Sequence, residues 1–360
     1  MSIITSLILS VFVGIFITLC CIYLLKPVAM HIGLVDVPGG RKTHAHVIPL
    51  IGGVSIFFGF CFALLCLNIS LHNYRGLLAG SSILILIGVM DDFRELTPRI
   101  RLAGQCLATL LLIEWGHIAV NHLGNLFFLG NVNLGIYSLF FTIFFVLGFI
   151  NSINMIDGHD GLAGLIVLGQ AFFFALLSVQ LHQFFNLYLL LIFMAVLCVF
   201  LVFNLPISKH KRVSIFMGDA GSTFVGFIIA WFAVDLSQVT FTHKNMMLHY
   251  SPMTILWVLA YPLYDLLFVI IYRLITNRSP FSASRDHLHY LLSDRGFQRT
   301  SITFMLFIFS VLLGSAGLFL AKQKMPESWQ LVCFLSVFVA YFGMMFFLTD
   351  AARRKCFAQV

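Results

Sequence analysis

Long apolar runs follow one another through almost the whole of this chain, and they restrict its fold more than any other feature. A helix needs about 20 consecutive apolar residues to cross the roughly 30 Å hydrocarbon core of a bilayer. Because 60% of the residues are hydrophobic and only 10% are charged, too little polar surface remains for a soluble domain. The sequence therefore predicts an all-α polytopic membrane protein, formed as a single domain over residues 1–360. We expect about eleven transmembrane helices, near 3–25, 50–69, 76–90, 102–120, 137–154, 162–180, 185–205, 221–239, 253–272, 302–321 and 330–348.

The basic residues fall unevenly on the two sides of this arrangement. All but four of the 21 lysines and arginines lie in loops of one side; the four on the other side are Arg75, Lys244, Lys322 and Lys324. Since cytoplasmic loops collect Lys and Arg, we predict an outside N-terminus and a cytoplasmic C-terminus. The net charge of +7 is then typical of a polarised membrane protein that attracts anionic lipids and substrates, and it does not indicate a nucleic-acid partner.

Acidic residues also gather on the predicted cytoplasmic side, where the orientation rule does not require them. In "GVMDDFRELTPRIR", Asp91 and Asp92 follow an apolar run, and two adjacent carboxylates repel each other. A divalent cation, alone or with a phosphate, would relieve that repulsion. Taken alone, such a pair is more often a solvated helix end.

The segment "NMIDGHDG" joins two predicted helices through a short acidic loop. Gly158 and Gly161 permit tight or left-handed backbone, so the carboxylates of Asp157 and Asp160 can converge. The loop contains no Lys or Arg, unlike the other loops of its side. The sequence is compatible both with a functional acidic pair and with an ordinary Asp-Gly turn.

In "RVSIFMGDAGSTFVGF", a basic run leads through Phe216 to small residues that begin an apolar helix. Small residues there expose backbone N–H groups, which are a natural place for phosphate. Asp219 could hold the Mg²⁺ that accompanies a phosphate, since Mg²⁺ prefers one or two carboxylates plus phosphate oxygens. A purely structural N-cap is the alternative for Asp219.

Two clusters of basic residues also lie on the predicted cytoplasmic side. In "NRSPFSASRDHLHYLLSDRG", Arg285, His287 and His289 favour anion binding over zinc, because no further ligand lies nearby. An interfacial amphipathic helix is the alternative for that loop. The cluster around Lys42 in "RKTHAHVIPLIGG", read alone, is typical of positive-inside anchoring. Together, the acidic and basic clusters predict one cytoplasmic site that uses Mg²⁺ and phosphate, with one lipid-borne and one soluble reactant.

Four segments, in order, resemble the polyprenyl-phosphate N-acetylhexosamine-1-phosphate transferase family: "MDDFRELTPRIRLAGQ", "NMIDGHDGLAG", "FMGDAGS" and "SPFSASRDHLHYLL". The resemblance covers about residues 26–297. It implies transfer of a sugar-1-phosphate from a UDP-sugar to undecaprenyl phosphate in the bacterial cytoplasmic membrane, with release of UMP and with Mg²⁺ or Mn²⁺ as cofactor. The lipid-linked product would start a surface polysaccharide, and a homodimer is compatible with the family.

The chain is most similar to the branch that uses UDP-N-acetylglucosamine (UDP-GlcNAc), because the branch that uses UDP-MurNAc-pentapeptide carries three consecutive histidines in the last loop. UDP-GalNAc, a 6-deoxy sugar and the pentapeptide substrate are the alternatives. An ion-coupled transporter is an alternative from another class. Transporters, however, place ionisable groups near the bilayer midplane, and here only Glu114 and Asp265 lie well within predicted spans, where we expect them to face protein or water.

The resemblance also implies roles for single residues. It implies catalytic roles for Asp91, Asp92, Asp160, His287 and His289. It implies substrate contacts for Lys42, Asn154, Asp157, Asn204, Phe216 and Arg285, with Phe216 stacking on uracil. It implies that Asp219 is a metal ligand and that Asp92 is a second metal ligand or base. Two positions depart from the family: Tyr290 replaces a histidine, and His159 replaces an apolar residue.

Overall fold

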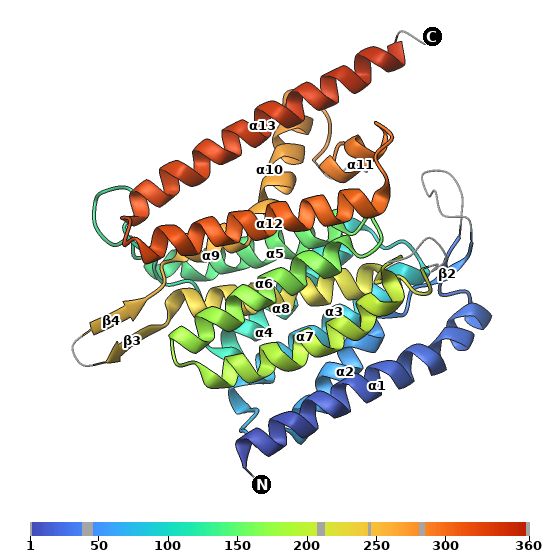
Figure 1. Ribbon diagram of the computed structural model, residues 1–360, viewed down its shortest axis with the longest axis horizontal. Coiled ribbons are helices and arrows are strands. Elements are labelled where there is room, and N and C mark those ends of the chain that lie inside the picture. The colour runs from blue at the N-terminus through green and yellow to red at the C-terminus, as the bar shows by residue number, and fades with distance from the viewer. Residues whose placement is uncertain (1, 38–45, 207–212, 244–245, 281–284, 358–360) are drawn as a thin grey trace.

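The computed structural model describes residues 2–37, 46–206, 213–243, 246–280 and 285–357, and most of this part of the chain is helical (Figure 1). The first helices are α1 (Ile3–Ile32), α2 (Gly52–Cys66), α3 (Arg75–Phe93), α4 (Pro98–Gly116), α5 (Ser138–Ile156), α6 (Leu162–Gln180) and α7 (Phe184–Asn204). The remaining helices are α8 (Gly218–Gln238), α9 (Pro252–Val258), α10 (Ala260–Ile275), α11 (Leu288–Ser293), α12 (Arg299–Lys322) and α13 (Glu327–Phe357). Two short antiparallel pairs join β1 (Val35–Asp36) to β2 (Ile48–Pro49) and β3 (Thr240–His243) to β4 (Met246–His249).

Each stretch that the sequence predicts to be helical corresponds to a helix of the structure with ends that differ by a few residues, except 253–272, which is divided into two helices. Among the described residues, eight helices are long and apolar enough to cross a membrane, or nine if α9 and α10 form one broken span. Helix α2 is apolar but has only 15 residues, and α4 carries Arg99, Arg101 and Glu114 within its length. The chain is therefore a multi-pass membrane protein, while the count of eleven spans and the orientation stay predictions.

The prediction of one continuous helix over 253–272 is wrong. The chain bends by 80° between α9 and α10, and Leu259 at the break has φ −92° and ψ 0°. Pro262 follows three residues later and has no N–H to donate to the carbonyl of Val258, so the helical ladder is interrupted at this point. The bend turns α10 away from the direction of α9 and toward α13 (Figure 1).

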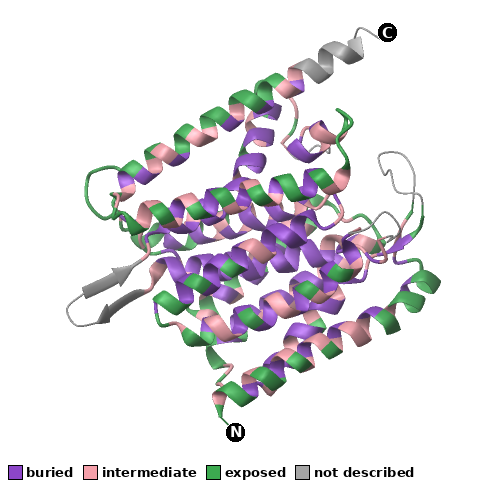
Figure 2. Cartoon of the chain, in the orientation of Figure 1, coloured by how far each residue is buried: buried purple, intermediate pink, exposed green. Residues whose placement is uncertain are grey.

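Helix α8 lies at the centre of the bundle, where α2, α3, α5 and α6 pack around it (Figures 1 and 2). In the most apolar 18-residue stretch of α8, 94% of the residues are buried. In the corresponding stretch of the peripheral α1, 22% are buried. Glycines allow the contacts at its beginning: a Cβ on Gly53 or Gly88 would lie 2.2 Å from backbone atoms of Gly221 or Ala220, respectively. Backbones therefore meet directly where α2 and α3 cross the start of α8.

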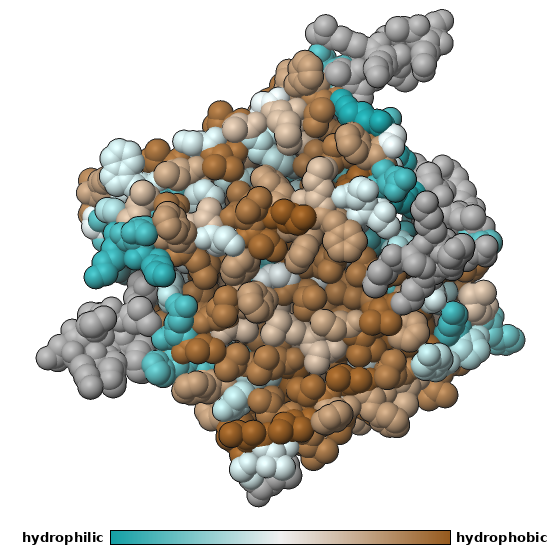
Figure 3. All heavy atoms as spheres, viewed as in Figure 1, coloured by the Kyte–Doolittle hydropathy of each residue, from teal (hydrophilic) through white to brown (hydrophobic). Residues whose placement is uncertain are grey.

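The outer surface has the distribution that a bilayer requires. Figure 3 shows apolar residues over the middle of the visible face, with hydrophilic residues gathered toward the two ends of the helices. Exposed apolar side chains such as Phe12, Phe144 and Phe347 belong to this surface, and in a membrane protein they face lipid rather than water. On the visible face, polar side chains therefore lie mainly at the helix ends.

Candidate active site

A cavity of about 470 Å³ lies at one end of the bundle, where α3, α5 and α7 end and where α8 and α12 begin. Carboxylates dominate its wall: the acidic lining residues are Asp36, Asp91, Asp92, Glu95, Asp157, Asp160 and Asp219. Among the described lining residues, one side chain, that of Arg299, carries a fixed positive charge. The sequence prediction that the acidic clusters meet in a single site is consistent with this geometry.

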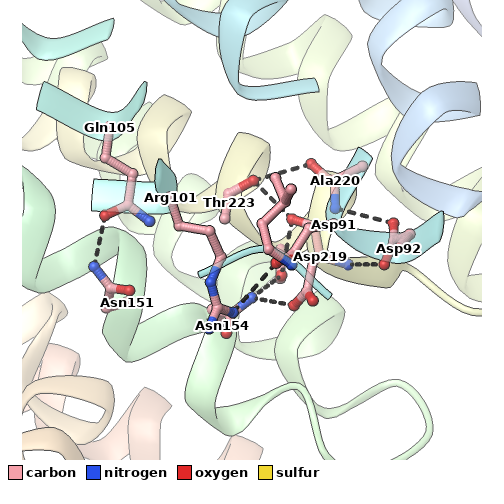
Figure 4. A network of polar contacts seen from close by, with 11 residues as sticks. Asp91, Asp92, Arg101, Gln105, Asn151, Asn154, Asp219, Ala220 and Thr223 are labelled. Carbon is pink, nitrogen blue, oxygen red and sulfur yellow. Dashed lines mark hydrogen bonds and ion pairs between the residues drawn. The ribbon is translucent and has the colours of Figure 1, made fainter. Parts of the chain in front are cut away.

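Asp92 holds the first turn of α8. Its Oδ1 accepts a hydrogen bond from the N–H of Asp219 at 2.8 Å, and its Oδ2 accepts one from the N–H of Ala220 at 3.2 Å (Figure 4). A carboxylate at this position satisfies free helix donors and complements the helix dipole. The expectation that these N–H groups are open to phosphate is therefore wrong, because an aspartate from α3 already occupies them.

Asp219 lies in the first turn of α8, not at its N-cap, which is Met217. The side-chain amide of Asn154, from the end of α5, donates to Asp219 Oδ1 at 2.6 Å and to the hydroxyl oxygen of Ser222 at 2.9 Å. The structural alternative of a simple N-cap is thus excluded for Asp219. Its side chain is instead held by a neighbouring helix at the cavity wall (Figure 4).

Asp91 lies on the other side of the same cluster. It is buried, and its Oδ1 accepts a hydrogen bond from the N–H of Leu96 at 2.7 Å. Its Oδ2 pairs with the guanidinium of Arg101 from α4 at 3.2 Å. The two adjacent aspartates therefore point to different partners, one to the start of α8 and one to α4.

The acidic loop between α5 and α6 is held by Asn204 at the end of α7. Gly161 has a left-handed φ of 72°, a conformation that glycine permits. Its N–H donates a hydrogen bond to Asn204 Oδ1 at 2.7 Å. The Asn204 amide in turn donates to the carbonyl of Ile215 at 2.9 Å. Burial, with the nearby charges of Asp219 and Asp160, raises the pKa of Asp157 to about 7. The carboxylates thus lie close enough to oppose one another's ionisation.

The donor set of the cavity fits a divalent cation that prefers oxygen. Carboxylate and amide oxygens are ligands that suit Mg²⁺, and a cation would offset the repulsion that raises the pKa of Asp157. Among the described residues, no three His, Cys, Asp or Glu side chains form a ready metal cage. Mg²⁺ does not need one, since it binds through one or two carboxylates plus substrate phosphates.

The two predicted histidines do not line the cavity. His287 Nδ1 lies 2.6 Å from Oδ2 of Asp265, a fully buried carboxylate of α10, and His289 is also fully buried. The HxH segment is partly extended, as expected: His287 is the extended N-cap of α11, and His289 lies within that helix. The rings of the two histidines stack with centroids 5.7 Å apart. They form a layer behind the cavity wall.

The predicted phosphate contacts differ from expectation. Arg285 forms an ion pair with Asp294 at 2.6 Å and lies over the ring of Tyr290, and it is not among the residues that line the cavity. Lys42 lies outside the described residues. Asn154, Asp157, Asp160, Asn204 and Phe216 all line the cavity, and the roles that the resemblance implies for them stay predictions.

Sequence reasoning missed Arg299 and Glu95 as site residues. Both line the cavity. Arg299 begins α12, far along the chain from the acidic motifs. Its position between a short polar loop and an apolar helix is the signal that could have identified it, because the acidic segments occupy the same kind of junction.

Known proteins with related sequences cover most of this chain. Undecaprenyl-phosphate alpha-N-acetylglucosaminyl 1-phosphate transferase from Escherichia coli (strain K12) is 33% identical to it, over 89% of this chain and 86% of that protein. The protein of the same name from Haemophilus influenzae is 31% identical, over 95% of this chain and 93% of that protein. The family model for glycosyl transferase family 4 matches residues 74–237. The chain belongs to glycosyl transferase family 4.

Membership in glycosyl transferase family 4 confirms both the resemblance seen in the motifs and the prediction that the chain is a transferase. The family match extends from the beginning of α3 to the end of α8. It therefore contains the acidic cluster from Asp91 to Asp219 and the Asn204 anchor. The wall formed by α11 and α12, with Tyr290 and Arg299, lies outside it.

Proposed function

We propose that this chain transfers N-acetylglucosamine-1-phosphate from UDP-GlcNAc to undecaprenyl phosphate at the cytoplasmic face of the bacterial inner membrane. The names of the related proteins support this acceptor and this sugar. The observation that carries the proposal is the cavity at the helix ends, where carboxylates from α3, from the end of α5 and from the first turn of α8 meet. We propose that a soluble nucleotide enters this cavity from the cytoplasm and that the lipid acceptor reaches it from the bilayer.

The reaction joins two anions, so alignment and charge neutralisation account for most of the catalysis. A phosphate oxygen of the lipid attacks the β-phosphorus of UDP-GlcNAc, the bond from that phosphorus to the bridging oxygen breaks, and UMP leaves. A bound Mg²⁺ would neutralise charge on the diphosphate and orient it. Asp219 and Asp157 are the residues that would hold it, since both oxygens of Asp92 already accept hydrogen bonds from α8.

The acceptor is proposed to approach Asp91 from the side of α4. A small second cavity between α3, α4 and α8 reaches Asp91 and Asp219, and Arg101 and Gln105 line it. The guanidinium of Arg101 is partly exposed there while it pairs with Asp91. A lipid phosphate arriving from the bilayer would meet Arg101 first and would replace Asp91 as its partner. Asp91 then orients the acceptor; a general base is less needed, because a phosphate is already largely ionised at pH 7.

Lipid-extractable label tests the proposal. Membranes that contain the chain, undecaprenyl phosphate, Mg²⁺ and radiolabelled UDP-GlcNAc are expected to yield label in the organic phase, and Asp219→Asn is expected to abolish it. Label from UDP-GalNAc or another UDP-N-acetylhexosamine alone would keep the chemistry and correct the sugar. Absence of label from every UDP-sugar, with UMP not released, would contradict the proposal.

The transporter alternative has little support from the geometry. Asp265 is the fully buried acid within the predicted spans, and hydrogen bonds from His287, Leu288 and Tyr341 satisfy it. It lines neither of the two cavities described above. Ion flux that was lost in Asp219→Asn while UMP release remained intact would favour a transporter over a transferase.

A further inference from the structure

A loop without charged residues joins α4 to α5. Residues 117–137, "HIAVNHLGNLFFLGNVNLGIY", contain no Asp, Glu, Lys or Arg. The loop lies where α4 ends and α5 begins, whereas the cavity lies where α5 ends and α8 begins, so the two are at opposite ends of the bundle. A loop that faces water normally presents polar residues at its surface. The composition of this loop therefore indicates contact with something other than water.

The tip of the loop exposes three consecutive apolar side chains. Phe127, Phe128 and Leu129 are 58%, 60% and 88% exposed, respectively. Consecutive exposed apolar residues are unfavourable in water, and a surface that retains them usually serves a contact. The three side chains are thus the part of the loop for which a partner has to be found.

Hydrogen bonds within the loop fix the shape of the tip. The N–H of Gly130 donates to Asn125 Oδ1 at 3.0 Å, and the N–H of Leu123 donates to the carbonyl of Val132 at 2.9 Å. Phe128 has a left-handed φ of 61°, which is rare for a bulky residue and persists only where the surroundings impose it. The exposed side chains are therefore presented by a defined backbone.

The beginning of α13 holds the same tip (Figure 1). The N–H of Phe128 donates to Ser328 Oγ at 3.2 Å, and the Ser328 hydroxyl donates to the carbonyl of Asn125 at 2.5 Å. The ring of Phe128 contacts the exposed ring of Trp329 edge to face, with centroids 5.8 Å apart. The four exposed residues Phe127, Phe128, Leu129 and Trp329 are called the apolar tip below.

The loop is continuous with the lipid-facing surface of the bundle. Ile136 and Tyr137, at its end, are exposed, and so are Phe140 and Phe144 in the first turns of α5. Residues 135–156 form one of the spans that are long and apolar enough to cross a membrane. Exposed apolar residues therefore lead from the lipid-facing side of α5 into the loop without an intervening charge.

We propose that the apolar tip inserts into the interfacial region of the bilayer, in the leaflet remote from the cavity. Aromatic side chains are enriched at this depth, and an uncharged loop has no ionised group to remove from water when it enters. Lipid is favoured over a protein partner because the loop continues a surface that already faces lipid. The contact would fix the beginning of α13, since only 17% of the most apolar stretch of that helix is buried in the bundle.

Tryptophan fluorescence of the full chain in liposomes tests the proposal. Leu129→Trp places a probe at the apolar tip. Gln323→Trp is the matched control, because Gln323 is exposed at the same end of the bundle but stands between Lys322 and Lys324. Phospholipids that are brominated close to the headgroup quench a probe in the interface, whereas iodide quenches a probe in water.

The probes are compared in a background that carries Trp115→Phe and Trp329→Phe. The two tryptophans that remain, Trp231 and Trp257, are buried and contribute equally to both variants. We expect the brominated lipid to quench Leu129→Trp several times more strongly than Gln323→Trp, and iodide to show the reverse order. The emission maximum of Leu129→Trp should also lie at the shorter wavelength.

Iodide quenching of Leu129→Trp as strong as that of Gln323→Trp would overturn the proposal, because the tip would then face water. A probe that neither quencher reaches would also overturn it, and would show that a second copy of the chain or another protein covers the tip. The thermal unfolding midpoint in detergent checks folding, and Phe127→Trp replaces Leu129→Trp if that variant does not fold. No nucleotide or acceptor lipid enters these measurements, so their outcome leaves the proposed function as it stands.

Discussion

Single residues at this site serve the fold and the chemistry together. Asp92 shows this most clearly, since one carboxylate from α3 completes the first turn of α8. The sequence suggests an acidic pair with a common task, but neighbouring residues on a helix face different directions. Only the packing of α3 against α8 and α4 decides that Asp92 becomes a helix cap while Asp91 pairs with Arg101.

Gly218, which begins α8, is expected to tolerate no side chain. It has a left-handed φ of 73°, and a Cβ there would lie 2.5 Å from Asp92 Oδ2. Gly218→Ala should therefore cost about 1–2 kcal/mol of stability from the backbone alone. It should also displace the Asp92 cap and reduce transfer activity. Thermal unfolding in detergent together with the label-transfer assay measures both effects; wild-type values for the two would contradict this description of the cap.

The raised pKa of Asp157 predicts a pH dependence of stability in the metal-free protein. The pKa of Asp157 in the folded protein is about 7, above the ordinary value of about 3.9 for an aspartate, so the folded protein binds the extra proton between these values. Its stability should consequently fall as the pH rises from about 4 to 7. Unfolding midpoints measured in EDTA across this range check the sign.

Asp157→Asn provides the control for that pH series, because an amide cannot ionise. The variant should show a flatter stability profile between pH 4 and pH 7 than the wild-type protein. A wild-type profile that rises steadily through this window, with no change in Asp157→Asn, would show that Asp157 ionises normally.

At the scale of the elements, helix locations are well encoded in the apolar runs, and helix breaks are less so. The span-length stretches became helices, because backbone groups in lipid must pair within their own segment. The bend at Leu259 was not predicted, because an apolar run does not show where the axis of a helix changes direction. Pro262 nevertheless provides a local cause for the bend. The β3–β4 pair was missed too, since two four-residue segments carry little periodic pattern. The short α11 lies in the loop for which an amphipathic helix was the alternative.

Close contact between α3 and α8 should matter more for activity than a typical helix contact. A Cβ on Gly88 would meet Ala220 backbone atoms, three or four residues along α3 from the two aspartates. Gly88→Ala should push the helices apart and move Asp91 and Asp92 away from Asp219. We expect a large loss of transfer activity, at least tenfold, beside a destabilisation of about 1–3 kcal/mol.

Gly148→Ala on α5 is the matched control for Gly88→Ala. A Cβ at Gly148 meets no atom within 4 Å, so the same substitution tests the loss of a helix glycine without a helix contact. This variant should retain activity. If both variants behaved alike in the label-transfer assay, close approach of α3 and α8 would not be what positions the acids.

For the whole molecule, the acidic residues of the site could be predicted from the sequence, whereas the wall formed by α11 and α12 could not. The acids occur in recognisable motifs at the ends of apolar runs, whereas Tyr290, His159 and Arg299 come together only through the packing of α11 and α12 on the acidic loop. His287 and His289 show the converse, because their motif is recognisable but their rings lie behind the cavity wall.

Asp265 of α10 is hydrogen-bonded to α11 and to α13. We expect that removing one of these hydrogen bonds lowers the stability of this C-terminal group of helices. Asp265 accepts hydrogen bonds from Leu288 of α11 at 3.1 Å and from the Tyr341 hydroxyl of α13 at 2.9 Å. Tyr341→Phe removes one bond to a buried carboxylate and should destabilise the protein by about 1.5–3 kcal/mol. Chemical unfolding in detergent measures the change, and a shift below about 0.5 kcal/mol would contradict a structural role for this contact.

The β3–β4 hairpin follows the end of α8, whereas the cavity lies at the beginning of that helix, so the hairpin and the site occupy opposite ends of the bundle (Figure 1). The chain can accordingly be opened at the hairpin without cutting any segment that lines the cavity. One fragment would then carry every lining carboxylate, and the other would carry Tyr290 and Arg299. Two such fragments, produced together in one cell, would each be inactive alone, and their recombination in the membrane would report directly on how the two walls of the site find each other.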